Sequence, residues 1–178
     1  MGVYEPGQGG NTAALSISFM CDGFLFKKMK KPEYYMNLAL KEAEKAAFED
    51  EIPIGCVIVK DDKVIARGHN KREGKNLVIS HAEIETISKA NKKLKSWRLV
   101  DCDIYVTVEP CLMCTGAIIQ SRIKNIYFGA KDSKGGALGS SINALDSKNL
   151  NHYPNVIGGV LEEKCAIIIK NYFKNKRK

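Results

Sequence analysis

The chain has 178 residues, of which 44% are hydrophobic, and it carries a formal net charge of +8 with an isoelectric point near 9.1. This length suits one globular domain with a sizeable core and leaves little room for a second domain. The positive charge favours an anionic partner such as nucleic acid, although a basic surface can also serve solubility alone.

The six cysteines form no dense framework, and Cys56, Cys102 and Cys165 lie in or beside apolar runs. This pattern is typical of buried free thiols in a reducing compartment. No run approaches the roughly 18 apolar residues of a membrane span, and the first apolar stretch, 13–20, has no basic region before it. We therefore expect a cytoplasmic protein without a membrane segment.

Residues 1–28 differ from the rest of the chain, because they hold four glycines within the first ten positions and show no sustained periodicity. We expect a flexible N-terminal extension, or a leader placed before a start at Met29. Residues 29–178 are then expected to form a single domain that ends in a basic helix or tail.

The expected secondary structure begins with a helix at Pro32, where a proline in the first turn precedes apolar residues at three- and four-residue spacings. Two apolar runs, Ile54–Lys60 and Val64–His69, flank an Asp-Asp-Lys turn and predict a β-hairpin. The elements expected further along are a helix over 80–90, a strand over 104–108, a helix over 110–120, a strand over 124–128, a loop over 130–155 with one short helix near 142–145, a strand over 156–161 and a helix over 162–173.

The alternation of strands and helices predicts an α/β fold in which a sheet lies between layers of helices. The hairpin near the start makes this sheet mixed, with about five strands. Ser80 is the candidate N-cap of the second long helix.

A possible metal site lies at Cys111 and Cys114, which follow Pro110 at the end of an apolar, β-branched run. At a spacing of three on a helix, their sulfurs share one face and can both bind one ion at about 2.3 Å. The helix N-terminus lowers the pKa of a thiol and so favours the thiolates that a metal needs. Zinc is the expected metal. A thioredoxin-like redox pair is the alternative, but that motif needs no upstream histidine and glutamate.

Thirty residues upstream, His81 offers a third ligand and Glu83 a carboxylate. Positions two apart within a helix point different ways, so we expect the metal to lie beyond the helix N-terminus, with His81 in the first turn. Three protein ligands are one fewer than a structural zinc site has, which leaves a position for water. Zinc brings the pKa of that water towards neutrality, and Glu83 can move its proton to a leaving group. Taken separately, the histidine and the glutamate would be ordinary surface or core residues.

The pattern H-x-E followed by P-C-x-x-C resembles the signature of zinc-dependent base deaminases. From about 34 to 174 the chain also resembles the bacterial tRNA-specific adenosine deaminases. The stretches that carry this resemblance are Ile52–Gly55, Gly68–Asn70, His81–Glu83, Tyr105–Cys111, Ser121–Ile123, Tyr127–Ala137 and Asn151–His152.

The resemblance implies a three-layer α/β/α cytidine-deaminase-like fold and hydrolytic conversion of the wobble adenosine of a tRNA anticodon loop to inosine. It implies one zinc ion per subunit, a catalytic Glu83, and a homodimer whose sites are built partly from the neighbouring subunit. The metal ligands that it implies are His81, Cys111 and Cys114. Two alternatives stay open: a deaminase of free nucleobases or nucleotides, which would not need a basic tail, and a zinc-stabilised RNA-binding subunit without turnover, which would not need Glu83.

By the same resemblance, Asn70 hydrogen-bonds the purine, and the backbone around Ala82 helps to hold the target base. Asn70 could instead be an ordinary turn residue at a strand end. Four further residues match loops that contact the anticodon or border the mouth of the site, and each could also be a solvated loop residue. These four are Asp132, Lys134, Asn151 and His152.

Residues 170–178 carry five positive charges and no acid. Beside an RNA groove they would contact phosphates, and Phe173 or Tyr172 could stack on a base. A basic tail can also be a solvated terminus, and Phe173 can be part of the core. Tyr153 occupies a position where the family usually has arginine, which puts one expected phosphate contact in doubt.

Overall fold

The computed structural model describes residues 30–177, so the expected leader over 1–28 lies outside the described residues. The elements, in chain order, are α1 (Pro32–Phe48), β1 (Gly55–Lys60), β2 (Lys63–His69), α2 (Arg72–Lys75), α3 (Ala82–Leu94), β3 (Cys102–Val108), α4 (Leu112–Gln120), β4 (Asn125–Ala130), η1 (Ala144–Asp146), β5 (Asn155–Ile157) and α5 (Glu162–Lys176). Between residues 30 and 177, no helix is both long and apolar enough to cross a bilayer.

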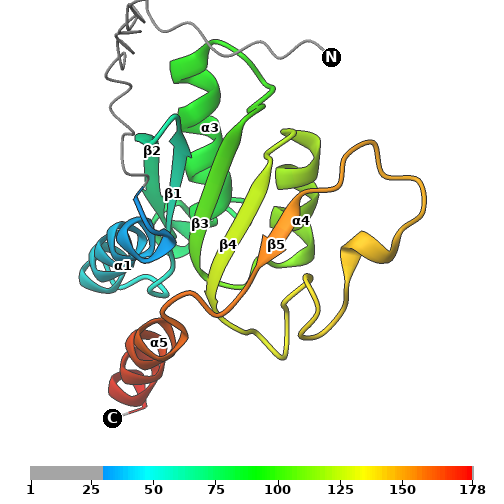
Figure 1. Cartoon of the computed structure of the whole chain (residues 1–178). Helices are drawn as coiled ribbons and strands as arrows, with labels where there is room; N and C mark the ends of the chain where they lie inside the picture. Colours follow the sequence, from blue (N-terminus) through cyan, green and yellow to red (C-terminus); the bar gives the residue numbers. More distant parts are fainter. Residues whose placement is uncertain (1–29, 178) are drawn as a thin grey trace, which may run out of the picture.

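The five strands form one mixed sheet in the order β2-β1-β3-β4-β5. Strand β1 is antiparallel to both β2 and β3, whereas β4 is parallel to β3 and to β5. Strands β2, β3 and β4 therefore run in the same direction, and their C-terminal ends meet at one edge of the sheet (Figure 1). The segments that follow these three strands are thereby brought together.

Helices cover both faces of the sheet, which confirms the three-layer α/β/α arrangement (Figure 1). On β1 the side chains alternate between the two faces. Cys56 and Ile58 join the core under α3 and α4, while Val57 and Val59 pack with Tyr35 and other residues on the α1 side. Both faces of the strand are therefore buried. The other two cysteines expected to be buried free thiols, Cys102 and Cys165, are also buried and free.

The structure differs from the sequence-based expectations mainly at the ends of elements. Helix α3 begins at Ala82 with His81 as its N-cap residue, and the buried Ser80 hydroxyl has no hydrogen-bond partner, so the expectation that Ser80 caps this helix was wrong. Helix α2 falls in a stretch expected to be loop. Strand β5 ends at Ile157 because two glycines follow, the second with a φ of 82°.

Gly55 allows α1 to lie close against β1, because a Cβ atom at this position would meet the backbone of Ala39 and Ala43. We predict that Gly55→Ala lowers the free energy of unfolding by about 1–3 kcal/mol, as overpacking of a core does. Chemical denaturation of the purified protein measures this.

The matched control is Gly116→Ala in α4, where an added Cβ meets nothing within 4 Å. That change should raise the free energy of unfolding by up to about 1 kcal/mol, because alanine favours the helix. Equal stability of the two variants would contradict the close packing of α1 on β1.

Candidate metal centre

Three side chains of types that bind metals converge at the sheet edge where β3 ends. His81 is the N-cap residue of α3, Cys111 is the N-cap residue of α4, and Cys114 lies in the first turn of α4. The Nδ1 atom of His81 lies 3.7 Å from Cys111 Sγ and 3.6 Å from Cys114 Sγ. The three donor atoms all lie within 4.8 Å of one another. A tetrahedral ion bound to one nitrogen and two sulfurs would hold such donors about 3.5 Å apart, so the donor set fits a single ion.

The two thiols are electrostatically different. The hydrogen bond with Cys114 is the main cause that lowers the pKa of Cys111 to about 4, while burial opposes it and His81 assists. The hydrogen bond with Cys111, together with burial, raises the pKa of Cys114. The pair therefore carries one negative charge at neutral pH beside a helix N-terminus, which suits the binding of a cation.

Glu83 lies in the first turn of α3 and is buried. Burial is the main cause that raises its pKa to about 7, and the nearby charge of Cys111 acts in the same direction. A carboxyl group in this condition can both hold and release a proton near neutral pH. This is the property that general acid–base catalysis needs.

Glu109 is also buried, but backbone N–H groups surround its carboxylate. Oε1 accepts hydrogen bonds from the amides of Leu138 (2.9 Å) and Ser140 (3.1 Å), and Oε2 accepts one from Asp132 (3.3 Å). Burial alone would raise the pKa of Glu109, yet these hydrogen bonds outweigh it and lower the pKa. Glu109 thus anchors the loop after β4, a role that the sequence pattern did not reveal.

The anchored loop lies beside the cysteines, since an isolated β-bridge pairs Cys111 with Gly136. Asp132 and Lys134 belong to this loop, where the amide of Lys134 donates to Asp132 Oδ1 at 2.9 Å. The structure therefore brings these two expected RNA-contacting residues to the edge of the sheet that holds the metal-binding cluster.

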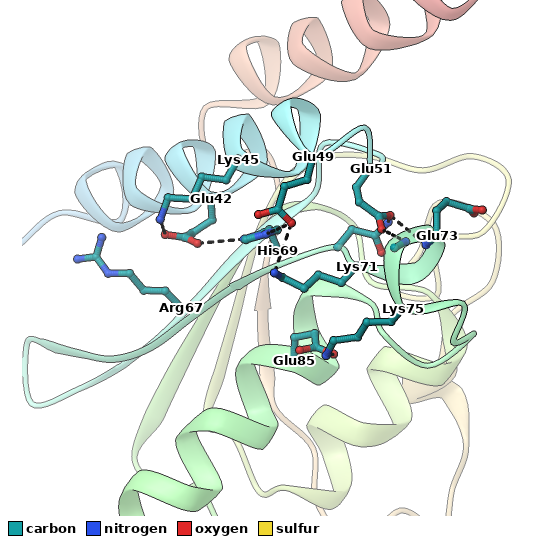
Figure 2. Close-up of polar contacts among 12 residues, drawn as sticks. Glu42, Lys45, Glu49, Glu51, Arg67, His69, Lys71, Glu73, Lys75 and Glu85 are labelled. Carbon is teal, nitrogen blue, oxygen red and sulfur yellow. Dashed lines mark hydrogen bonds and ion pairs between the residues drawn. The ribbon is translucent and has the colours of Figure 1, made fainter.

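Asn70 lies directly after β2 at the same edge and is buried. Its Nδ2 atom donates to Glu51 Oε2 at 2.9 Å, and its backbone amide donates to Ile54 at 3.0 Å. Next to it, the ring of His69 lies between Glu42 and Glu49, with nitrogen–oxygen distances of 3.3 and 3.1 Å (Figure 2). The expected purine contact is therefore held by Glu51 and Ile54, beside a second group of polar side chains around His69.

The remaining expected contacts lie in three places. Ala82 is buried as the first residue of α3, next to His81. Phe173 is 39% exposed on α5, and its neighbour Tyr172 donates to the Asp50 carbonyl, which places this end of α5 at the site edge. His152 Nε2 lies 2.6 Å from the Ile123 carbonyl, before β4 begins.

That hydrogen bond places His152 at the opposite edge of the sheet, where the segment leading into β5 enters (Figure 1). Asn151 precedes it and is exposed. Within one chain the structure does not bring this pair to the metal-binding cluster.

Comparison with known proteins adds independent information. The model of the MafB19-like deaminase family matches residues 30–177. A tRNA-specific adenosine deaminase of Bacillus subtilis is 45% identical over 150 residues, which cover 84% of this chain and 93% of that protein. A solved structure from work on A-to-I editing by tRNA:A34 deaminases at the wobble position is 44% identical, with a TM-score of 0.74, and the match covers 76% of this chain and 98% of that one. A guanine deaminase from Bacillus subtilis is 38% identical with a TM-score of 0.55, over 57% of this chain and 66% of that one.

We predict that Glu109→Gln loosens the loop over 131–140, because the amide nitrogen of glutamine would face a backbone N–H donor where the carboxylate now accepts. The loss should be about 1–3 kcal/mol, the range for an unpaired buried polar group. Hydrogen exchange should become faster at the amide of Asp132, because the remaining oxygen of glutamine can still accept from Leu138 and Ser140. Glu163→Gln, an exposed acid of α5, is the control and should change neither quantity. Unchanged exchange in Glu109→Gln would show that the loop is held by other contacts.

Proposed function

The chain belongs to the family of tRNA-specific adenosine deaminases, and we propose that it converts the wobble adenosine of a tRNA anticodon loop to inosine by hydrolytic deamination. The observation that carries this proposal is the convergence of His81, Cys111 and Cys114 beside the buried Glu83. A metal site with only three protein ligands and an adjacent carboxyl group suits hydrolysis rather than structural support. The tRNA substrate comes from the relatives that the chain resembles over most of its length.

We propose that His81, Cys111 and Cys114 hold one zinc ion per subunit. One nitrogen and two sulfur donors at the observed separations match the ligand preference and tetrahedral geometry of zinc. When bound, zinc supplies a Lewis acid that lowers the pKa of a water molecule towards neutrality.

The side chains around the metal ligands perform the proton transfer and hold the base. Glu83 accepts the proton that the attacking water gives up as its oxygen bonds to C6 of adenine. The carboxyl group then returns this proton to the exocyclic amino group, which leaves as ammonia when the C6–N bond breaks. Asn70 and the backbone at Ala82 orient the purine during these steps. Since Glu83 is buried, bulk water does not compete for the proton that it carries.

Recognition of the RNA is assigned to the loop and the helix that flank the site. Asp132 and Lys134 are held at the site edge by Glu109, and they are proposed to contact the nucleotides next to the wobble base. The basic end of α5 supplies phosphate contacts, and Phe173 offers a partly exposed ring for stacking.

Asn151 and His152 lie at the other edge of the sheet, so they can reach the anticodon loop at this site only from a second subunit. A homodimer is part of the proposal for this reason.

Exposed apolar side chains lie close to the metal ligands. They are Leu77, Val78 and Ile79, shortly before His81, and Leu112, which follows Cys111 and is 58% exposed. An apolar surface of this kind fits a subunit interface beside the site. The proposal also includes a single domain over residues 29–178 and a location in the cytoplasm, where a tRNA substrate would be found.

The function is tested with a panel of anticodon stem-loops whose wobble position is adenosine, at stated salt, with detection of inosine. We expect inosine from a stem-loop and much slower turnover of free adenosine, cytosine or guanine. Faster turnover of a free base would favour the alternative, a nucleobase deaminase. The similarity to a guanine deaminase is the observation that supports this alternative.

Glu83→Gln distinguishes an enzyme from a non-catalytic RNA-binding subunit. The variant should lose about 10²- to 10⁴-fold in kcat, because it removes the proton carrier, while zinc content and RNA binding stay at the wild-type level. The control is Glu85→Gln in the same helix turn, whose carboxylate pairs with Lys75 at 2.6 Å. Full turnover by Glu83→Gln would refute the proposed role.

We predict that the protein sediments at twice its chain mass of 19.7 kDa at micromolar concentration. Val78→Asp should weaken the dimer by more than about tenfold, since it places a charge in an apolar interface. Phe48→Ser is the control, because Phe48 is 94% exposed at the end of α1 and is not part of the proposed interface. A monomer at all concentrations would leave Asn151 and His152 without a route to the site.

A further inference from the structure

Glu51 is a buried carboxylate without an ion-pair partner among residues 30–177. It is 2% exposed and lies between the end of α1 and Pro53. Figure 2 shows it facing the turn that carries Glu73. Because a buried charge is costly unless hydrogen bonds satisfy it, the donors around Glu51 explain why it is tolerated.

The two oxygen atoms of Glu51 have different partners. Oε1 accepts from the backbone amide of Gly74 at 2.7 Å. Oε2 accepts from the side-chain amide of Asn70 at 2.9 Å and from the backbone amide of Glu73 at 3.3 Å. The carboxylate therefore joins the turn over 72–75 to the asparagine that follows β2.

All three partners of the Glu51 carboxylate are N–H donors, so the carboxylate fixes which way the amide of Asn70 is turned. The NH₂ group must face Glu51, which leaves the carbonyl oxygen and one N–H for other partners. The backbone of Asn70 is fixed as well, by its hydrogen bond to Ile54. Without the carboxylate, the two ends of the amide are nearly equal in shape and could exchange places.

We propose that Glu51 is a positioning residue for catalysis, which sets the donor and acceptor pattern that Asn70 presents to the purine. This inference rests on the proposed function, in which Asn70 contacts the target base. An amide held in one orientation can match one arrangement of donors and acceptors on a base edge and reject its reverse. Glu51 thereby acts on base recognition without touching the substrate.

The competing explanation is that Glu51 only holds the turn over 72–75. Glu51→Gln separates the two roles, because glutamine keeps one oxygen, which can still accept from Gly74. Its NH₂ group then faces the NH₂ group of Asn70 and the backbone amide of Glu73. The Glu73 amide loses its acceptor, whereas the Asn70 side chain is expected to turn over and offer its oxygen to the new NH₂ group.

The test is a double-mutant cycle on the zinc-loaded dimer with the anticodon stem-loop. Asn70→Ala and Glu51→Gln should each lower kcat/KM by roughly 5- to 150-fold, the range of one mispaired buried polar group. In the double variant the effects should not add, because Glu51 acts through Asn70. Glu49→Gln is the control; its carboxylate pairs with His69 and Lys71, and kcat/KM should stay within about twofold of wild type.

Three further measurements make the outcome independent of folding and of the overall function. Zinc content and hydrogen exchange at Gly74 show whether Glu51→Gln keeps the fold and the turn, and the NMR signals of the Asn70 side-chain amide report its hydrogen bonding directly. Additive losses of kcat/KM, or an unchanged Asn70 amide signal in Glu51→Gln, would overturn the proposal. Failure of the wild-type protein to edit any stem-loop would instead refute the proposed function, while the NMR signal still tests the orientation of Asn70.

Discussion

A carboxylate that leaves water must find hydrogen-bond donors or take up a proton, and this constraint organises the edge of the sheet where β2, β3 and β4 end. Three of the four buried glutamates between residues 30 and 177 meet it in different ways. Glu51 and Glu109 are surrounded by N–H groups, and at Glu109 these hold the pKa below its ordinary value. At Glu83 burial outweighs the hydrogen bonds from its own backbone amide and from Cys114, and the pKa rises to about 7. The same residue type thus anchors neighbouring backbone at two positions and has a pKa near neutrality at the third.

Glu51 and Glu109 hold two segments in place that are not fixed by strand pairing or by a long helix. The turn over 72–75 and the loop over 131–140 lie on either side of the metal ligands, and each is joined to the sheet through backbone amides that donate to one buried carboxylate. A loop that is ordered before RNA arrives loses less conformational entropy on binding. The rigidity of the site therefore comes from polar groups, whereas the rigidity of the sheet comes from its two apolar cores.

The sequence predicted the convergence of His81, Cys111 and Cys114 and the layered fold, because spacing and strand direction encode them. His81 and Cys111 are the N-cap residues of two helices that begin at the same edge of the sheet. The sequence implied this arrangement, because His81 and Glu83 can face one ion only if the ion lies beyond a helix N-terminus. The roles of Glu51 and Glu109 could not be predicted, since they depend on which backbone amides turn towards each carboxylate. The position of His152 also could not be predicted, because sequence similarity does not show at which edge of the sheet a loop residue lies.

The hydrogen bond from Tyr172 to the Asp50 carbonyl and the ion pair of Lys176 with Asp50 fasten α5 to the residue directly before Glu51. Asp50 itself has a φ of 63°, so the chain bends sharply at this junction. An exposed ion pair of this kind is weak, so an anion such as phosphate can compete with Asp50 for Lys176. An anion bound at the C-terminal end of α5 would therefore draw on the same lysine that fastens this helix to the segment before Glu51.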